Sequence, residues 1–294
     1  MTYSCIHTHS TFCDGLDTIE TICAAAYERG FASIGFSSHA PLGEKTGLTS
    51  DWHMGENRLD EYVETVRRAR RRWEGRLAVF LGLEVDYIRG LMGPADRDIQ
   101  ALGLDYLIGS VHYVFPPGKD LPMAVDSPGD EFERDMGKYF SGDGEALAAA
   151  YWDSLDEMIL AGGFDILGHA DLVKKNNPGQ KWFSTGGPDY RRRLEKTAAI
   201  TAEAGITVEV NTGGLNRGRI PETYPSLEML RLLGAKKVPL TITADAHRVG
   251  ELGGHYGEAR RTIMAAGYTG TMFFEGRREG RPVWRAEALE EGEP

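Results

Sequence analysis

Seven short apolar segments of this chain are each followed by a segment of helical character. The clearest covers residues 77–85, a nearly continuous apolar run that is typical of a strand buried on both faces of a parallel sheet. Short strands that alternate with helices long enough to cross over favour a parallel α/β fold. The predicted strands cover residues 2–7, 33–37, 77–85, 106–111, 164–167, 206–210 and 239–243.

The predicted helices lie between these strands and after the last one. They cover residues 18–29, 57–73, 94–102, 145–160, 188–204, 224–233 and 258–266. We interpret the arginine-rich stretch at 67–72 as the solvated face of a helix rather than as an anion site.

The whole chain of 294 residues is expected to form one domain, because no linker or low-complexity stretch divides it. A regular alternation of this kind predicts a barrel of about seven parallel strands. A doubly wound open sheet is the structural alternative. Its dinucleotide-binding form is not expected, because no G-x-G-x-x-G turn opens a helix.

Two segments stand outside this alternation. Residues 115–143 are rich in Pro, Gly and Asp, and we interpret them as a long insertion loop that serves as a lid or substrate loop. Residues 273–274 and 283–284 are expected to pair in a C-terminal hairpin, and the acidic tail from Glu287 is expected to be frayed.

Composition limits the class of partner. The formal net charge of −11 argues against a nucleic-acid partner, which requires a basic surface, but allows a small phosphorylated substrate. No apolar run approaches the length of a membrane span and no signal sequence is evident, so we expect a cytoplasmic protein with no membrane partner. Cys5, Cys13 and Cys23 fit reduced thiols better than disulfides. The oligomeric state is left open.

Histidines and carboxylates gather just after the predicted strands. His7 and His9 share one face of the first strand, because side chains alternate along a strand, and Asp14 follows in a loop closed by Gly15. In a barrel the strand ends share one mouth. The nine candidate metal ligands are His7, His9, Asp14, His39, Glu84, His112, His169, Asp245 and His247.

These ligand types predict a centre with more than one metal ion. Carboxylates that converge repel one another unless cations neutralise them, and nine groups exceed the needs of one ion. Imidazole and carboxylate without thiolate suit Zn, Fe or Mn, so we expect two or three divalent ions. Such centres mostly hydrolyse phosphate esters or amides. His53 and His255 lie in polar segments and are interpreted as non-ligands.

The same residues carry a resemblance to a known family. The motifs His-Thr-His at 7–9, Gly-Leu-Glu-Val-Asp-Tyr at 82–87, Asn-Thr-Gly-Gly at 211–214 and Asp-Ala-His at 245–247 are among those that resemble the polymerase-and-histidinol-phosphatase (PHP) superfamily. The Glu84 and Asn211 motifs and the chain length resemble its stand-alone histidinol-phosphatase branch.

The resemblance implies a distorted, TIM-like barrel (the PHP fold) of seven strands with three metal ions. It assigns His7, His9, Glu84 and Asp245 to the first ion. The second shares Glu84 and takes His112 and His169, and the third takes Asp14, His39 and His247. Some relatives have a histidine where Asp14 stands, so the third ion is the least defined.

The resemblance also implies an activity: a phosphomonoesterase that hydrolyses L-histidinol phosphate to L-histidinol and phosphate in histidine biosynthesis. We expect Glu84, Asp245, His247 and Arg217 to act in catalysis. Arg217 and Lys174 are the candidate phosphate ligands, with Arg248 as a third.

Two other functions remain open from the sequence. One is a different PHP-type phosphoesterase that acts on nucleotides or other small phosphate esters. The other is a non-catalytic metal-binding barrel, which would be expected to lack a ligand, and none of the nine is missing.

Overall fold

A seven-stranded parallel sheet with the order β1-β2-β3-β4-β7-β8-β9 forms the centre of the computed structural model, which describes residues 3–289. All seven correspond to predicted strands, so the predicted parallel α/β fold is confirmed; Thr2, included in the first predicted strand, lies outside the described residues. The strands are β1 (Tyr3–Cys5), β2 (Phe31–Phe36), β3 (Ala78–Asp86), β4 (Tyr106–Ser110), β7 (Ile166–Leu167), β8 (Thr207–Asn211) and β9 (Leu240–Thr243).

The sheet curls into a nearly closed barrel, and its first and last strands meet just past their carboxyl ends. Thr8 and Ala246 form a parallel bridge there. The His9 backbone N–H donates to the Ala246 carbonyl at 2.8 Å, and the Ala246 N–H donates to the His7 carbonyl at 3.2 Å. The ring of strands is therefore closed at the rim of the mouth, next to the candidate residues His7, His9, Asp245 and His247.

The interior of the barrel is filled around Tyr106. A Cβ atom added to Gly35 of β2 or Gly82 of β3 would lie 2.5 Å from atoms of the Tyr106 side chain, so glycine is required at both positions. Ile6, Ile108 and Ile166 complete the inner layer. The barrel is thus a packed core rather than a pore.

The end of the barrel opposite the mouth is covered by the antiparallel hairpin of β10 (Gly270–Arg278) and β11 (Arg281–Ala288). Phe274 of β10 is buried against Tyr106 and Phe80, with ring centroids 5.3 and 4.9 Å apart. A hairpin was predicted here. Glu287 belongs to β11, and the rest of the predicted frayed tail from residue 290 lies outside the described residues.

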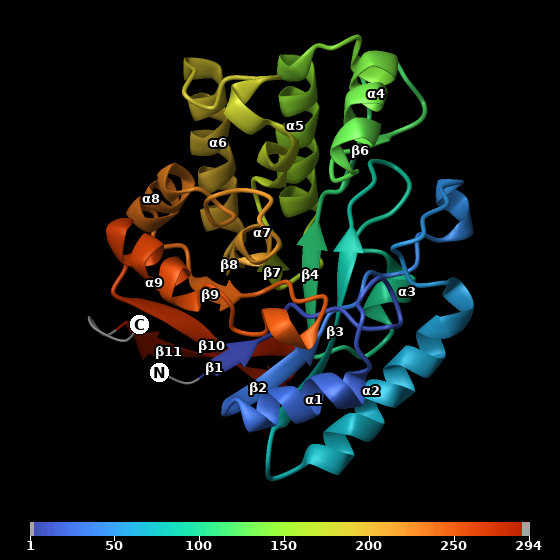
Figure 1. Ribbon diagram of the computed structural model, residues 1–294, viewed down its shortest axis with the longest axis vertical. Coiled ribbons are helices and arrows are strands. Elements are labelled where there is room, and N and C mark those ends of the chain that lie inside the picture. Colours follow the sequence, from blue (N-terminus) through green and yellow to red (C-terminus); the bar gives the residue numbers. More distant parts are fainter. Residues whose placement is uncertain (1–2, 290–294) are drawn as a thin grey trace.

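Helices surround the barrel, and α4, α5 and α6 stand side by side at one end of the view in Figure 1. The α-helices are α1 (Ile19–Glu28), α2 (Leu59–Trp73), α3 (Arg97–Gln100), α4 (Gly129–Phe140), α5 (Gly144–Ala161), α6 (Pro188–Ala204), α7 (Gly213–Asn216), α8 (Leu227–Ala235) and α9 (Tyr256–Ala265). Short 3-10 turns are η1 (Glu44–Thr46), η2 (Glu56–Arg58), η3 (Leu172–Asn176), η4 (Pro178–Gln180) and η5 (Val249–Glu251).

The structure corrects the prediction that residues 115–143 form a long loop. The short strands β5 (Tyr113–Val114) and β6 (Met123–Ala124) pair antiparallel, and helix α4 fills much of the remainder. Phe132, Met136 and Phe140 are buried on one face of α4 at helical spacing. The high content of Pro, Gly and Asp obscured this pattern.

Two predicted helices are shorter than expected. The one at 94–102 is reduced to the four residues of α3. The one at 224–233 begins only at Leu227, because Pro225 precedes it and the Ser226 hydroxyl caps its first turn. Within the described residues, no helix is long and apolar enough to cross a membrane.

Candidate metal centre

The nine predicted ligands lie together at the barrel mouth. Seven of them are buried, and Asp14 and His247 are partly exposed. His7 and His9 follow β1, His39 follows β2, and Asp245 and His247 follow β9. The predicted convergence at one rim therefore agrees with the geometry, whereas their role as ligands stays a prediction.

Glu84, near the end of β3, lies at the centre of the cluster. Its Oε2 atom is 3.0 Å from His39 Nδ1, 3.3 Å from His7 Nε2 and 3.5 Å from His9 Nε2. Its Oε1 atom is 2.8 Å from His169 Nε2. The two oxygens of one carboxylate thus face different sets of imidazoles, as a bridging ligand would.

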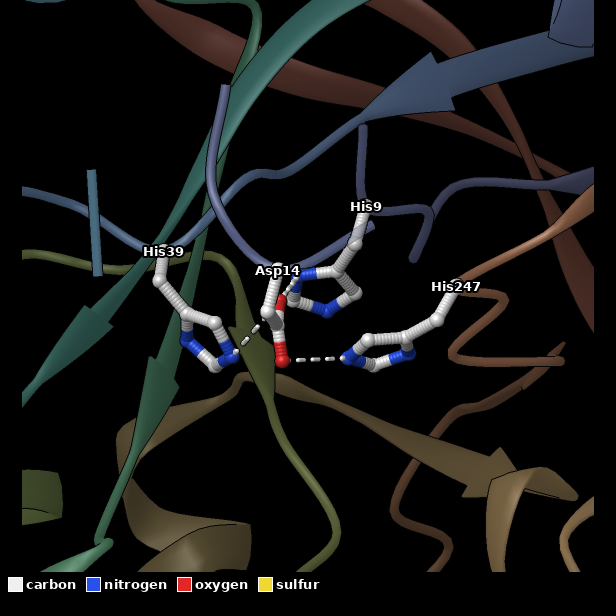
Figure 2. A group of neighbouring side chains, drawn as sticks. All are labelled: His9, Asp14, His39 and His247. Carbon is white, nitrogen blue, oxygen red and sulfur yellow. Dashed lines mark ion pairs between the residues drawn. The ribbon is translucent and has the colours of Figure 1, made fainter. Parts of the chain in front are cut away.

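Asp14 faces three imidazoles at the outer side of the cluster (Figure 2). Its Oδ2 atom is 3.2 Å from His247 Nε2, and its Oδ1 atom is 3.7 Å from His9 Nδ1 and 3.9 Å from His39 Nε2. The donor atoms of these four residues lie within 4.8 Å of one another. This group contains all three residues that the resemblance assigned to the third ion, with His9 in addition.

Two further groups match the other predicted sets. His7, His9 and Asp245 form one, in which Asp245 Oδ1 is 3.1 Å from His9 Nε2. Glu84, His112 and His169 form the other. His9 belongs both to the group around Asp14 and to the group with His7 and Asp245, and Glu84 lies at the centre of the cluster. Ions held by these groups would therefore be close neighbours.

Several buried atoms of the cluster have no hydrogen-bond partner within the part of the chain that the structure describes. Burying polar atoms without a partner is costly, so such atoms are rare unless an ion or water satisfies them. All are nitrogen or oxygen atoms that could hold a divalent cation, so the residues present fit metal ions. They include His7 Nε2, His9 Nε2, Asp14 Oδ1, His39 Nδ1 and Glu84 Oε2.

The buried environment of the cluster also changes the pKa values of its histidines. Burial, followed by the nearby His247 and His39, lowers the pKa of His9 to about 3. Burial also disfavours a charged His112, but the adjacent Asp86 carboxylate raises its pKa to about 10. Burial and neighbouring charges thus shift the pKa values of two candidate ligands in opposite directions.

Two buried carboxylates behind the cluster were not predicted. Asp86 Oδ1 is 3.0 Å from His112 Nδ1, and Asp86 Oδ2 is 2.8 Å from His53 Nε2. Glu209 Oε2 is 2.8 Å from His7 Nδ1. Glu209 lies inside a predicted strand, away from the strand ends where the candidates were sought. Asp86 directly follows the predicted strand at 77–85, so its position was an available signal that was not used.

A cavity of about 400 Å³ opens over the cluster and contains the guanidinium of Arg217. Arg217 Nη2 donates to Asp245 Oδ2 at 2.9 Å, so this predicted phosphate ligand also holds a predicted metal ligand. Lys175 and Arg219 line the cavity and were not predicted.

The other two phosphate candidates lie elsewhere. Lys174, expected to bind phosphate, is not among the lining residues. Its ammonium lies 2.8 Å from both Asp171 and Glu222, whereas the next residue of η3, Lys175, lines the cavity. Arg248 also lies outside the lining and pairs with Glu251 at 3.0 Å.

The segment that was expected to act as a substrate loop does reach the cavity. Asp126, Ser127, Pro128 and Glu131 are among its lining residues. Lys175 donates to Asp126, both to its carboxylate and, at 3.0 Å, to its carbonyl oxygen. The start of α4 is thus fixed over the cluster.

Comparison with known proteins places the chain in a family, because the PHP domain model matches residues 6–213. The protein belongs to the PHP domain family. The matched residues comprise more than half of the chain and include seven of the nine predicted ligands.

Individual relatives agree with this assignment. A probable histidinol-phosphatase of Deinococcus radiodurans is 29% identical over 262 residues, which cover 89% of this chain and 92% of the relative. The histidinol-phosphatase of Bacillus subtilis is 29% identical over 265 residues, covering 85% and 95%. The histidinol phosphate phosphatase of Lactococcus lactis, whose crystal structure holds zinc, L-histidinol and phosphate, shares the fold with a TM-score of 0.65 at 18% identity, covering 92% of this chain and 96% of the relative. The barrel of this PHP protein is therefore that of its structural relatives.

Proposed function

We propose that this PHP protein hydrolyses L-histidinol phosphate to L-histidinol and phosphate, a step of histidine biosynthesis. The observation that carries the proposal is the cavity of about 400 Å³ that seven of the nine cluster residues line together with Arg217, Arg219 and Lys175. That both curated relatives are named for this activity supports the choice of substrate. We place the reaction in the cytoplasm, consistent with three free cysteines.

Two or three divalent ions, of zinc, iron or manganese, are proposed at the three groups that match the predicted sets. When bound, such ions lower the pKa of water and neutralise phosphoryl oxygens. His7, His9, Glu84 and Asp245 would hold the first ion. Glu84, His112 and His169 would hold the second, and Asp14, His39 and His247 the third.

The basic side chains of the cavity would bind the phosphoryl group. Arg217 is oriented by Asp245 and lies 3.2 Å from His247 Nδ1, so its position next to the cluster is fixed. Arg219 and Lys175 add positive charge on the same cavity wall. Guanidinium and ammonium groups aimed at oxygens that gain charge in the transition state lower the barrier.

The acidic and aromatic side chains would bind the other half of the substrate, which carries an ammonium group and an imidazole. Trp52 lines the cavity and stacks on Tyr113, with centroids 5.6 Å apart and planes 9° apart. Asp51, Asp126 and Glu131 line the same space. An aromatic face with carboxylates beside it suits a cationic group.

Hydrolysis breaks the bond between phosphorus and the ester oxygen while a water oxygen bonds to phosphorus. Ser127 is the only serine or threonine in the described lining, and its hydroxyl forms no hydrogen bond to a basic side chain within the described residues. We therefore propose direct attack by water, without a phospho-enzyme. Single turnover in ¹⁸O-labelled water should place the label in the phosphate released, as cleavage of the bond between phosphorus and the ester oxygen requires, and no phosphorylated side chain should be trapped. A trapped phosphorylated side chain would contradict direct attack.

A substrate panel tests the function. Metal-supplemented protein would be assayed on histidinol phosphate, nucleoside monophosphates, a phosphodiester and short single-stranded DNA. We expect kcat/KM to be at least about 100-fold higher for histidinol phosphate, the free-energy equivalent of about 2.7 kcal/mol. A preference for nucleotides or DNA would identify a different PHP phosphoesterase, and no turnover of any compound would identify a metal-binding barrel without catalysis.

A further inference from the structure

A carboxylate is enclosed completely within the barrel wall, in strand β8. The Glu209 side chain is 0% exposed and does not line the cavity, so it meets neither solvent nor substrate. Burying a charge is expensive unless hydrogen bonds compensate it. The contacts of Glu209 therefore identify what this charge does.

Each carboxylate oxygen of Glu209 accepts two hydrogen bonds. Oε2 accepts from His7 Nδ1 and from the Thr243 hydroxyl, both at 2.8 Å. Oε1 accepts from the His169 backbone N–H at 2.7 Å and from Asn211 Nδ2 at 2.8 Å. The four donors come from the ends of β1, β7, β8 and β9, so one carboxylate connects four places on the barrel rim.

The contact with His7 determines which ring nitrogen is free. A carboxylate accepts only, so the proton of a neutral His7 is held on Nδ1, and the lone pair lies on Nε2. His7 Nε2 has no hydrogen-bond partner among the described residues and lies 3.3 Å from Glu84 and 3.6 Å from Asp245. The ring is therefore presented with its ligating atom toward the first proposed ion.

The contact with His169 acts through the backbone. Its N–H is fixed by Glu209, and its ring nitrogen Nε2 lies 2.8 Å from Glu84 Oε1. His169 was assigned to the second ion, whereas His7 was assigned to the first. Glu209 thus contacts one candidate ligand of each of two proposed metal positions, without itself lining the cavity.

We infer that Glu209 is a positioning residue that sets the ring orientation of His7 and the backbone of His169, and so couples the affinities of two metal positions. This inference rests on the proposed function, since it requires metal ions at those positions. Replacing a residue that forms a hydrogen bond to a metal ligand typically weakens metal binding by about 10- to 100-fold.

The inference also explains the Asn-Thr-Gly-Gly motif. Asn211 does not line the cavity; its Nδ2 donates to Glu209 and its Oδ1 accepts from the Gly213 N–H at 2.7 Å. A Cβ atom at Gly213 would lie 2.6 Å from Arg217 Nη2 and 2.8 Å from Asp245 Oδ2. Asn211 therefore connects Glu209 to the turn on which Arg217 approaches the cluster.

If Glu209 served only to connect strands, its replacement would have a different effect. The substitution would lower the stability of the metal-free protein and leave the metal affinity of the folded fraction unchanged. Glu209→Gln distinguishes the two, because it keeps the shape but replaces one acceptor oxygen with a donor NH₂, so that all four donors can no longer be satisfied.

The test measures zinc affinity by competition with a chromophoric chelator, together with the melting temperature of the metal-free protein. Asp156→Asn is the matched control: this carboxylate is also buried and accepts from the Thr197 hydroxyl at 2.6 Å, but between α5 and α6. We expect Glu209→Gln to bind zinc about 10- to 100-fold more weakly, and Asp156→Asn to bind it like the parent. Equal zinc affinity in parent and Glu209→Gln would overturn the inference.

A second measurement needs no variant. In ¹⁵N-histidine NMR of the zinc-loaded parent, His7 should carry its proton on Nδ1, and a His7 protonated on Nε2 would refute the inference even if Glu209→Gln does not fold. A parent protein that binds none of zinc, iron and manganese would remove the proposed function as well, so the two failures are distinguishable.

Discussion

Arg217 holds Asp245 from two sides: Nη2 donates to Oδ2 at 2.9 Å, and Nη1 donates to the backbone carbonyl at 2.7 Å. Asp245 has a φ of 48°, in the left-handed region that non-glycine residues rarely adopt. Residues held in such conformations concentrate at functional sites, where the surroundings offset the strain. Arg217 therefore holds a predicted metal ligand while it lines the cavity that we propose binds the phosphoryl group.

Replacing Arg217 with Ala should lower kcat/KM for histidinol phosphate by about 10- to 100-fold, because a charged hydrogen bond contributes about 1.5–3 kcal/mol. Arg217→Lys should recover only part of the loss, since a single ammonium lacks the rigid, planar set of donors with which the guanidinium holds Asp245 and faces the cavity at the same time. Steady-state kinetics with metal analysis of both variants would check this. Arg248→Ala, outside the cavity, is the control, and an unchanged kcat/KM in Arg217→Ala would exclude Arg217 from the site.

Glu84→Gln should lose metal and activity together while the fold is kept. The carboxylate faces imidazoles with both oxygens, and an amide offers one acceptor and no charge. We expect activity to fall by more than about 100-fold, beyond the loss typical of residues behind the ligands. Elemental analysis and far-UV circular dichroism provide the measurement, with exposed Glu203→Gln as control. Full metal content with near-parental activity would contradict a bridging Glu84.

Removal of metal by a chelator should abolish activity and lower the melting temperature. Ligands that bind only the folded state stabilise it by about 2.7 kcal/mol at 100 times their Kd, which corresponds to about 5–10 °C for a chain of this size. Zinc, manganese or iron should restore both quantities. His255→Gln should behave like the parent, because His255 is exposed and pairs with Glu258. Calorimetry that shows no shift on chelation would argue against resident ions.

Trp52→Leu should raise KM for histidinol phosphate by about 5- to 30-fold, the equivalent of a cation–π contact of about 1–2 kcal/mol. Turnover of a small phosphate ester without a cationic group should change little. The ratio of kcat/KM for the two substrates is the measurement. A loss shared equally by both substrates would indicate a structural rather than a recognition role.

The buried thiol of Cys23 should make stability fall at alkaline pH. Burial and the charge of Glu20 raise its pKa to about 12, well above that of an exposed thiol near 8.5. The unfolded state then loses its proton first, so the free energy of unfolding falls as pH rises from about 8.5 toward 12, by up to about 1.4 kcal/mol per pH unit. Urea unfolding between pH 9 and 10.5 should show a shallower decline in Cys23→Ala, and parallel declines would refute this origin.

The barrel and the convergence of the nine candidates could be predicted because both follow from strand periodicity. His39, Glu84 and His169 each stand at the end of an apolar segment, and parallel strands bring such ends to one rim. Glu209 escaped prediction for the same reason: it lies inside its strand, where sequence alone does not distinguish a buried charge with four donors from a residue that faces solvent.

The basic side chains that line the cavity were predicted less well, because they are carried by turns. Lys174 and Lys175 are adjacent, and only the path of η3 determines which ammonium reaches the cavity. Helix α4 was hidden for a different reason: its buried positions Phe132, Met136 and Phe140 are separated by charged residues in a segment whose composition is typical of a loop.

The bridge between Thr8 and Ala246 has a consequence for synthesis on the ribosome. His7 precedes its partner Glu209 by 202 positions, and Ala246 follows later still. Until these later segments have been translated, the histidines that follow β1 have no assembled neighbours with which to hold a cation. The proposed metal positions are thus complete only in chains translated past Ala246, and products terminated before that point lack the assembled cluster.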